Sequence, residues 1–137
     1  MACLLLSRDT RGMHLLGIGL AGALGSLSRY GVSVVAIHFL GRAFPFGTLA
    51  VNAIGALLLG LLMAQWMQEG GDPDPWRTAA ATGFLGAFTT FSTFSYETIV
   101  LYEREGAGLA VANVAANLVL GLAAATLGMF LARQLSA

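Results

Sequence analysis

Four long apolar stretches dominate this 137-residue sequence and limit what it can fold into. They cover approximately residues 13–39, 46–67, 76–102 and 106–131. Each is close to or longer than the ~20 residues that an α-helix needs to cross the hydrocarbon core of a bilayer. No segment alternates polar and apolar residues as the strands of a membrane barrel do. The sequence therefore predicts an all-α membrane protein, a single transmembrane domain of four helices that spans residues 1–137.

The low charge content excludes two other classes of protein. Charged residues make up 10% of the chain, against roughly 25% in soluble domains. The seven basic residues are all arginines, and seven acidic residues balance them. A chain with this composition has neither the charged surface of a soluble domain nor the basic footprint of a nucleic-acid-binding protein.

The distribution of arginine bears on how the chain is oriented in the membrane. If the four stretches cross in succession, the N-terminus, the second-to-third connection and the C-terminus lie on one side. The arginines on that side are Arg8, Arg11, Arg77 and Arg133, and those on the other are Arg42, Arg104 and, if it lies near that end of the first helix, Arg29. Arginine near helix ends sets orientation, and four against two or three is a weak bias. Such a chain can insert either way round, which permits an antiparallel dimer.

Amide side chains interrupt two of the apolar stretches, and polar groups inside a membrane helix are costly and usually functional. Asn52 lies in the second stretch, with Thr48 one turn earlier on the same helical face. In the fourth stretch Asn113, Asn117 and Gly121 recur every four residues and form a narrow polar stripe. Hydrogen bonds between helices, worth about 1 kcal/mol each, are one explanation. The other is an ion path, because a row of amide N–H donors suits a dehydrated anion.

The third stretch is poor material for an uninterrupted helix. It contains Gly83 and Gly86, followed by hydroxyl-bearing residues and phenylalanines between residues 88 and 95. Non-helical backbone at membrane depth is tolerated only where protein or a water-filled cavity surrounds it. A break there frees carbonyls that can coordinate a cation. We therefore expect the third helix to be broken.

Aromatic and ionisable residues follow in the same stretch. Phe91 and Phe94 lie three residues apart and would share a helical face, where they could pack in the core or present their positive ring edges to an anion. Glu97, together with Arg29 in the first stretch, either forms an ion pair or lines a separate aqueous mouth. No nucleophile, base and orienting acid can be assembled from these residues, so we do not expect an enzyme.

The order of these motifs resembles the Fluc/CrcB family of fluoride channels. The matching runs are Gly83 to Gly86, Thr89 to Ser95 followed by Glu97, Gly47 to Asn52, and Arg29-Tyr30. The resemblance covers essentially the whole chain, and the Thr-Thr-Phe-Ser-Thr-Phe run within it is highly specific. It implies an antiparallel, dual-topology homodimer in the plasma or inner membrane of a prokaryote, with two pores that export fluoride passively.

Residue pattern and resemblance together place a set of side chains along the pore. They are Asn52, Phe91, Phe94, Ser92, Thr93, Thr48, Asn113, Asn117, Glu97 and Arg29. By the resemblance, the edges of the two phenylalanines face fluoride and the arginine lies in a vestibule. The resemblance also implies a structural sodium ion at the centre of the dimer, held by the backbone carbonyls of Gly86 and Thr89.

Two other classes of membrane protein fit the helix count. A small multidrug exporter needs a membrane-embedded carboxylate, for which Glu97 is the only candidate because the first stretch contains no acid. A structural subunit without transport would leave the hydroxyl-rich third stretch without a purpose. The amide row and the aromatic edges by themselves indicate only a small dehydrated anion, and fluoride in particular follows from the resemblance.

Overall fold

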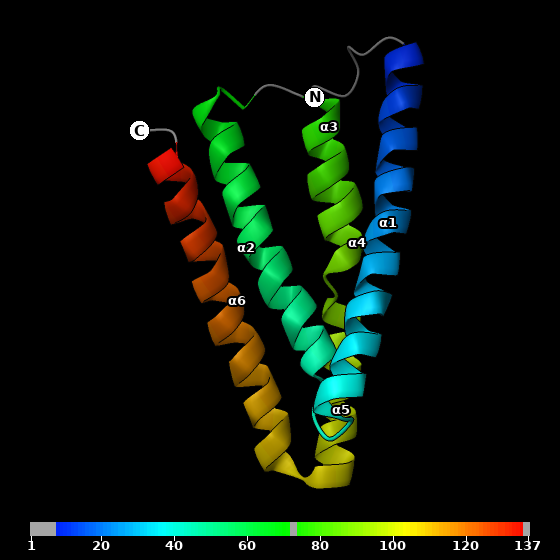
Figure 1. The fold of residues 1–137 in the computed structure, drawn as a ribbon, viewed down its shortest axis with the longest axis vertical. Helices are drawn as coiled ribbons and strands as arrows, with labels where there is room; N and C mark the ends of the chain where they lie inside the picture. The colour runs from blue at the N-terminus through cyan, green and yellow to red at the C-terminus, as the bar shows by residue number, and fades with distance from the viewer. Residues whose placement is uncertain (1–7, 72–73, 136–137) are drawn as a thin grey trace.

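The computed structural model describes residues 8–71 and 74–135, and within these residues the fold is helical and contains no strand. Its elements in chain order are α1 (Arg8–Leu40), α2 (Phe46–Gln68), α3 (Pro75–Thr78), the π-helical segment η2 (Ala79–Leu85), α4 (Gly86–Phe88), α5 (Phe91–Glu105) and α6 (Ala107–Leu135). The first, second and fourth apolar stretches of the sequence become α1, α2 and α6. The third is divided among the four shorter elements, which stack end to end (Figure 1).

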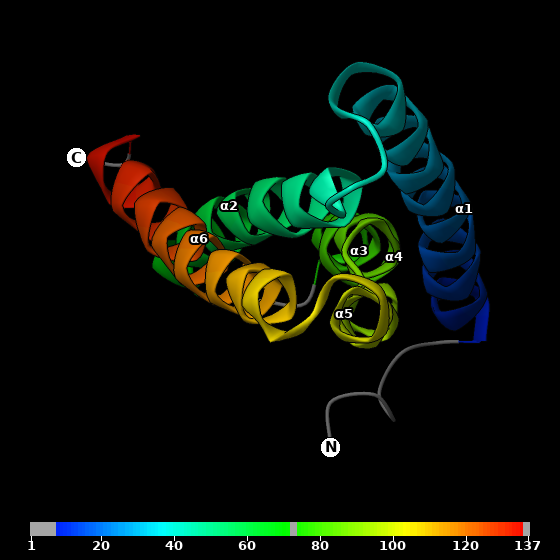
Figure 2. The same ribbon diagram turned by 90° about the horizontal axis from the view of Figure 1, so that it is seen from below.

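Three of the described helices are long and apolar enough to cross a membrane, by length and composition: Gly12–Leu40, Phe46–Gln68 and Ala107–Leu135. The elements α3 to α5 form a column that stands between α1 on one side and α2 with α6 on the other (Figure 2). The α1–α2 and α5–α6 connections lie at one end of the molecule, and the α2–α3 connection lies at the other (Figure 1). This arrangement agrees with the alternating course predicted from the sequence.

Glycines let the helices approach closely where they cross. A Cβ added at Gly128 would collide with the Leu57 carbonyl, and one at Gly60 with the Ala125 carbonyl, so α2 and α6 meet backbone to backbone. A Cβ at Gly83 would lie 2.7 Å from the Ile18 carbonyl oxygen, so η2 also approaches the backbone of α1 closely. Membrane helices associate through such small residues because lipid provides no hydrophobic drive between them.

The two ends of the column formed by α3 to α5 are fixed in different ways. Asp74 caps α3 by accepting a hydrogen bond from the Trp76 N–H at 2.9 Å. Arg77 forms ion pairs with Glu69, at the end of α2, and with Asp74 at 3.3 Å. At the other end, Gly106 adopts a φ of 88° between α5 and α6, a conformation that favours glycine. The column is thereby held in line with its neighbours.

Candidate functional site

The interruption between α4 and α5 lies at the middle of the column. Thr89 and Thr90 have extended backbone, with ψ angles of 159° and 115°. The Thr90 N–H donates to Asn52 Oδ1 at 2.8 Å, whereas in a continuous α-helix it would donate to the Gly86 carbonyl. The Thr93 N–H likewise donates to Thr90 Oγ1 at 3.2 Å and not to the Thr89 carbonyl. Both carbonyls are therefore without the helical donor that they would have in an unbroken helix.

Asn52 of α2 pairs with both the backbone N–H and the backbone carbonyl of Thr90. Besides accepting from its N–H, Asn52 donates through Nδ2 to the Thr90 carbonyl at 3.3 Å. Thr90 is also the N-cap of α5, because its hydroxyl satisfies the Thr93 N–H. The Asn52 amide and the Thr90 hydroxyl thus accept hydrogen bonds from the two backbone N–H groups that have no helical partner at this point.

The amide groups of α2 and α6 continue from there as a chain of hydrogen bonds. Asn52 Nδ2 donates to Asn117 Oδ1 at 3.0 Å, and Asn117 Nδ2 donates to Asn113 Oδ1 at 3.1 Å. Asn113 Nδ2 donates to the Thr98 hydroxyl at 2.8 Å, which in turn donates to the Phe94 carbonyl at 2.7 Å. Asn113 is fully buried. The amides predicted separately on two helices therefore form one connected polar track.

A cavity of about 350 Å³ lies beside this interruption. Its lining includes Asn52, Gly86, Thr89, Thr90 and Phe91. Of these, Phe91 is 79% exposed in the single chain. The polar backbone and the aromatic ring thus share a hollow that is open on the surface of the column.

The two phenylalanines share one side of α5, as their spacing predicts. The Phe91 and Phe94 ring centroids lie 5.7 Å apart with a tilt of 51° between the planes. Phe94 is half-buried, while Phe91 projects from the column. Ser92 and Thr93 are also exposed, and the Thr90 hydroxyl lies 3.2 Å from Ser92 Oγ and 3.0 Å from Thr93 Oγ1. The start of α5 therefore exposes hydroxyl groups and an aromatic ring.

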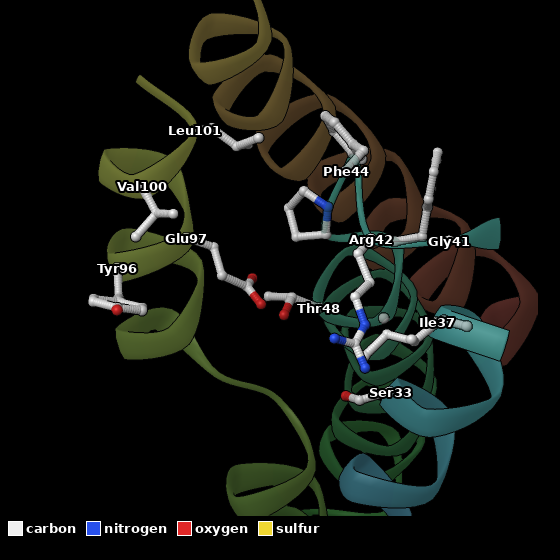
Figure 3. A pocket seen from close by; sticks show the side chains of 14 residues that line it. Ser33, Ile37, Gly41, Arg42, Phe44, Thr48, Tyr96, Glu97, Val100 and Leu101 are labelled. Carbon is white, nitrogen blue, oxygen red and sulfur yellow. The ribbon is translucent and has the colours of Figure 1, made fainter. Parts of the chain in front are cut away.

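Arg29 and Glu97 do not pair in the described structure. Arg29 of α1 reaches the interruption, where its Nη1 donates to the Thr89 carbonyl at 3.4 Å. Glu97 faces a different cavity of about 190 Å³, which opens near the α1–α2 connection. There its carboxylate lies beside the side chain of the buried Thr48 (Figure 3). Of the two arrangements left open by the sequence, the ion pair is absent among the described residues, and a separate mouth for each residue stays a prediction.

Sequence reasoning missed two threonines of this site. Thr90 stands in the sequence as one of several hydroxyl residues, although a Thr before a resumed helix is a recognised N-cap signal. Thr98 gives no local signal, because its role depends on Asn113, which lies 15 residues later and on another helix.

The site and its scaffold have counterparts among known proteins. The family model described as "CrcB-like protein, Camphor Resistance (CrcB)" matches residues 16–129. This chain belongs to the CrcB family. Among its CrcB relatives, the fluoride-specific ion channel FluC of Syntrophotalea carbinolica is 52% identical over 123 residues, which is 90% of this chain and 100% of the relative.

Further relatives agree with this assignment. The fluoride-specific ion channel FluC of Vibrio campbellii is 45% identical over 81% of this chain and 87% of its own length. The FluC of Citrifermentans bemidjiense is 45% identical over 89% of this chain and 98% of its own. These relatives are ion channels and not enzymes. Membership of a channel family, together with the spanning helices, makes the chain a multi-pass membrane protein.

Proposed function

We propose that this CrcB-family protein is a fluoride-selective channel that lets fluoride leave the cell passively across the plasma or inner membrane. The observation that carries the proposal is the continuous track from Thr90 through Asn52, Asn117 and Asn113 to Thr98. Its relatives named as fluoride-specific channels support the choice of ion.

The track offers what a dehydrated anion requires. Fluoride leaving water must regain hydrogen bonds, and amide N–H and hydroxyl groups are donors that can replace its hydration shell. The donors here are held in place before an ion arrives, since each Asn amide is already bonded to a neighbour. Dipoles that packing already holds in place keep the cost of reorganisation low in a low-dielectric setting. An ion moving along the track would exchange these internal bonds one at a time.

The phenylalanine pair supplies a second kind of contact. An aromatic ring is positive at its edge, and Phe91 projects into the open hollow that Asn52 also lines. Phe94 lies beside it and connects to the track through its carbonyl, which accepts from Thr98. We propose that ring edges on one wall and polar hydrogens on the other line a passage that favours a small anion over a cation.

We propose that the working unit is an antiparallel homodimer. The exposed surface at the start of α5 carries Ser92, Thr93 and Phe91, and Gly86 is exposed in α4. Polar backbone and hydroxyl groups exposed to lipid are costly, so this surface requires a protein partner. The weak arginine bias allows a second copy to insert in the opposite orientation. Two copies would close the open hollows against one another.

A structural sodium ion at the centre of this dimer fits the same surface. The carbonyls of Gly86 and Thr89 have lost their helical donors to Asn52 and Thr90. Unwound backbone carbonyls at membrane depth can coordinate Na⁺. Arg29 shares the Thr89 carbonyl, but a carbonyl oxygen has two lone pairs. Two carbonyls from each copy would provide four ligands.

Ion flux from liposomes tests this function directly. The purified protein is reconstituted, and fluoride efflux is compared with chloride efflux in the absence of a proton gradient. A channel of the proposed kind releases fluoride rapidly and chloride far more slowly. Transport that requires a proton gradient would point to a proton-coupled exporter, and no transport of either ion would point to a structural subunit.

A further inference from the structure

The cavity beside Glu97 contains a positive residue that no part of the track uses. Besides Glu97, the charged residue in its lining is Arg42, from the connection between α1 and α2. Figure 3 shows the Arg42 side chain extending into the cavity, with its guanidinium toward the hydroxyl groups of Ser33 and Thr48. Among the described residues, the Arg42 guanidinium makes no ion pair or hydrogen bond. Its donors are therefore available.

Glu97 creates an electrostatic problem at this mouth. Its carboxylate lies beside Thr48, and Glu97 Oε2 is buried and has no hydrogen-bond partner among the described residues. A carboxylate in a partly buried cavity repels an approaching anion, because the protein screens charge far less than water does. An anion path that opens past Glu97 needs a counter-charge nearby, and Arg42 lines the same cavity.

We propose that Arg42 is the anion-capturing residue of this mouth: its guanidinium holds the entering or leaving fluoride and offsets the charge of Glu97. The proposal rests on the proposed channel function and extends it to the step at which the ion passes between water and the track. Thr48 joins the two parts, since it contacts Glu97 and lies one helical turn before Asn52. An anion released by Arg42 would therefore meet a hydroxyl group before it reaches the first amide.

The chain offers a matched control for this residue. Arg104, in the last turn of α5, lies at the same end of the molecule as Arg42 but does not line the cavity. Removing either arginine changes the net charge and the count of positive residues on that side of the membrane equally. A difference between Arg42→Ala and Arg104→Ala therefore reports the position of the guanidinium within the mouth.

The test measures fluoride efflux from liposomes at low and high ionic strength for the parent, Arg42→Ala, Arg42→Lys, Arg104→Ala, Glu97→Gln and the Arg42→Ala/Glu97→Gln double variant. We expect Arg42→Ala to lower the initial rate at low salt by about fivefold or more, with a smaller loss at high salt, as for electrostatic attraction. Arg42→Lys should keep most of the rate, and Arg104→Ala should stay near the parent. In the Glu97→Gln background, Arg42→Ala should lower the initial efflux rate by at most about half as much as it does in the parent.

Three results would overturn the proposal: a parent-like rate for Arg42→Ala, an equal loss in Arg104→Ala, or a loss from Arg42→Ala that is the same with and without the Glu97→Gln substitution. If Arg42→Ala fails to assemble in detergent, Arg42→Gln against Arg42→Lys decides the question, since only the lysine keeps the charge. A parent protein that releases no fluoride would remove the channel function itself. Fluoride flux in the parent with no effect at Arg42 removes only this inference.

Discussion

The carboxamide of Asn52 pairs with the backbone N–H and C=O of Thr90 across 38 residues of sequence, with Oδ1 accepting from the N–H at 2.8 Å and Nδ2 donating to the carbonyl at 3.3 Å. Asn52 is therefore a structural partner of the interrupted column as well as the first amide of the polar track. The effect of a substitution at Asn52 on the structure must therefore be measured separately from its effect on ion flux.

Replacing Asn52 with Asp tests the donor role. Aspartate keeps an oxygen that can accept from the Thr90 N–H, but it loses the Nδ2 donor to Thr90 and Asn117 and places a like charge on the path of an anion. We expect fluoride flux to fall by more than about tenfold, since two charge-sensitive contacts are lost in a low-dielectric site. Efflux from liposomes measures the loss, and size-exclusion chromatography checks that the protein still assembles. Near-parent flux in an assembled protein would remove Asn52 from the ion path.

The rings of Phe91 and Phe94 are tested by aliphatic residues of similar size. Phe94→Ile and Phe91→Ile retain most of the bulk but remove the positive ring edge. If these edges stabilise fluoride, flux should fall by about tenfold or more, at a stability cost of about 1–2 kcal/mol. Efflux and thermal unfolding in detergent are measured on the same preparations. Well-folded variants that conduct at the parent rate would leave the rings as packing residues.

The α2–α6 contact makes a prediction about stability. Gly128→Ala would drive a Cβ into the Leu57 carbonyl, whereas a Cβ at Gly108 on the same helix meets nothing within 4 Å. We expect Gly128→Ala to destabilise the protein by about 2 kcal/mol. Gly108→Ala should be neutral or slightly stabilising, because Ala has the higher helix propensity. Thermal unfolding in detergent distinguishes them, and equal midpoints for the two variants would show that α2 and α6 are less tightly packed than described.

Dual topology is tested by labelling in membranes. A cysteine-reactive or antibody-accessible tag at the C-terminus should be reached from both sides of the membrane in one preparation, because the arginine bias is weak. Adding two or three arginines at one end should shift the population toward one orientation and lower the yield of functional dimer. Labelling from one side only in the parent would contradict the antiparallel arrangement.

The sodium site is tested by exchange of the cation. If the carbonyls of Gly86 and Thr89 hold sodium between two copies, its removal should weaken the dimer and lower fluoride flux, with recovery on adding sodium back. A bulky organic cation of the same charge and concentration serves as the control for ionic strength. Unchanged dimer stability and flux after complete replacement of sodium would exclude a structural role for the ion.

Much of the fold follows from sequence because lipid acts on each segment separately. A run of about 20 apolar residues crosses a bilayer whatever its neighbours do, and so the three long helices appear close to the predicted ranges. The differences lie at their ends: α1 begins at Arg8 and α6 extends to Leu135, where polar residues continue the helices beyond the apolar core. In the third stretch, glycines and hydroxyl residues argue against a continuous helix, and Thr89 and Thr90 are extended there.

Partners within the site required the tertiary structure. The sequence alone placed Asn52, Asn113 and Asn117 on polar faces, since helical periodicity is local. Only the crossing of α2 with α6, where glycines allow the backbones to touch, joins Asn52 to Asn117 across 65 residues of sequence. The packing of α1 and α2 against the column likewise directs Arg29 to the Thr89 carbonyl and places Glu97 in the same cavity as Thr48. Sequence thus determined which segments enter the membrane and which faces are polar, whereas close helix packing decided which polar groups meet, because hydrogen bonds form only between atoms that packing brings within about 3 Å.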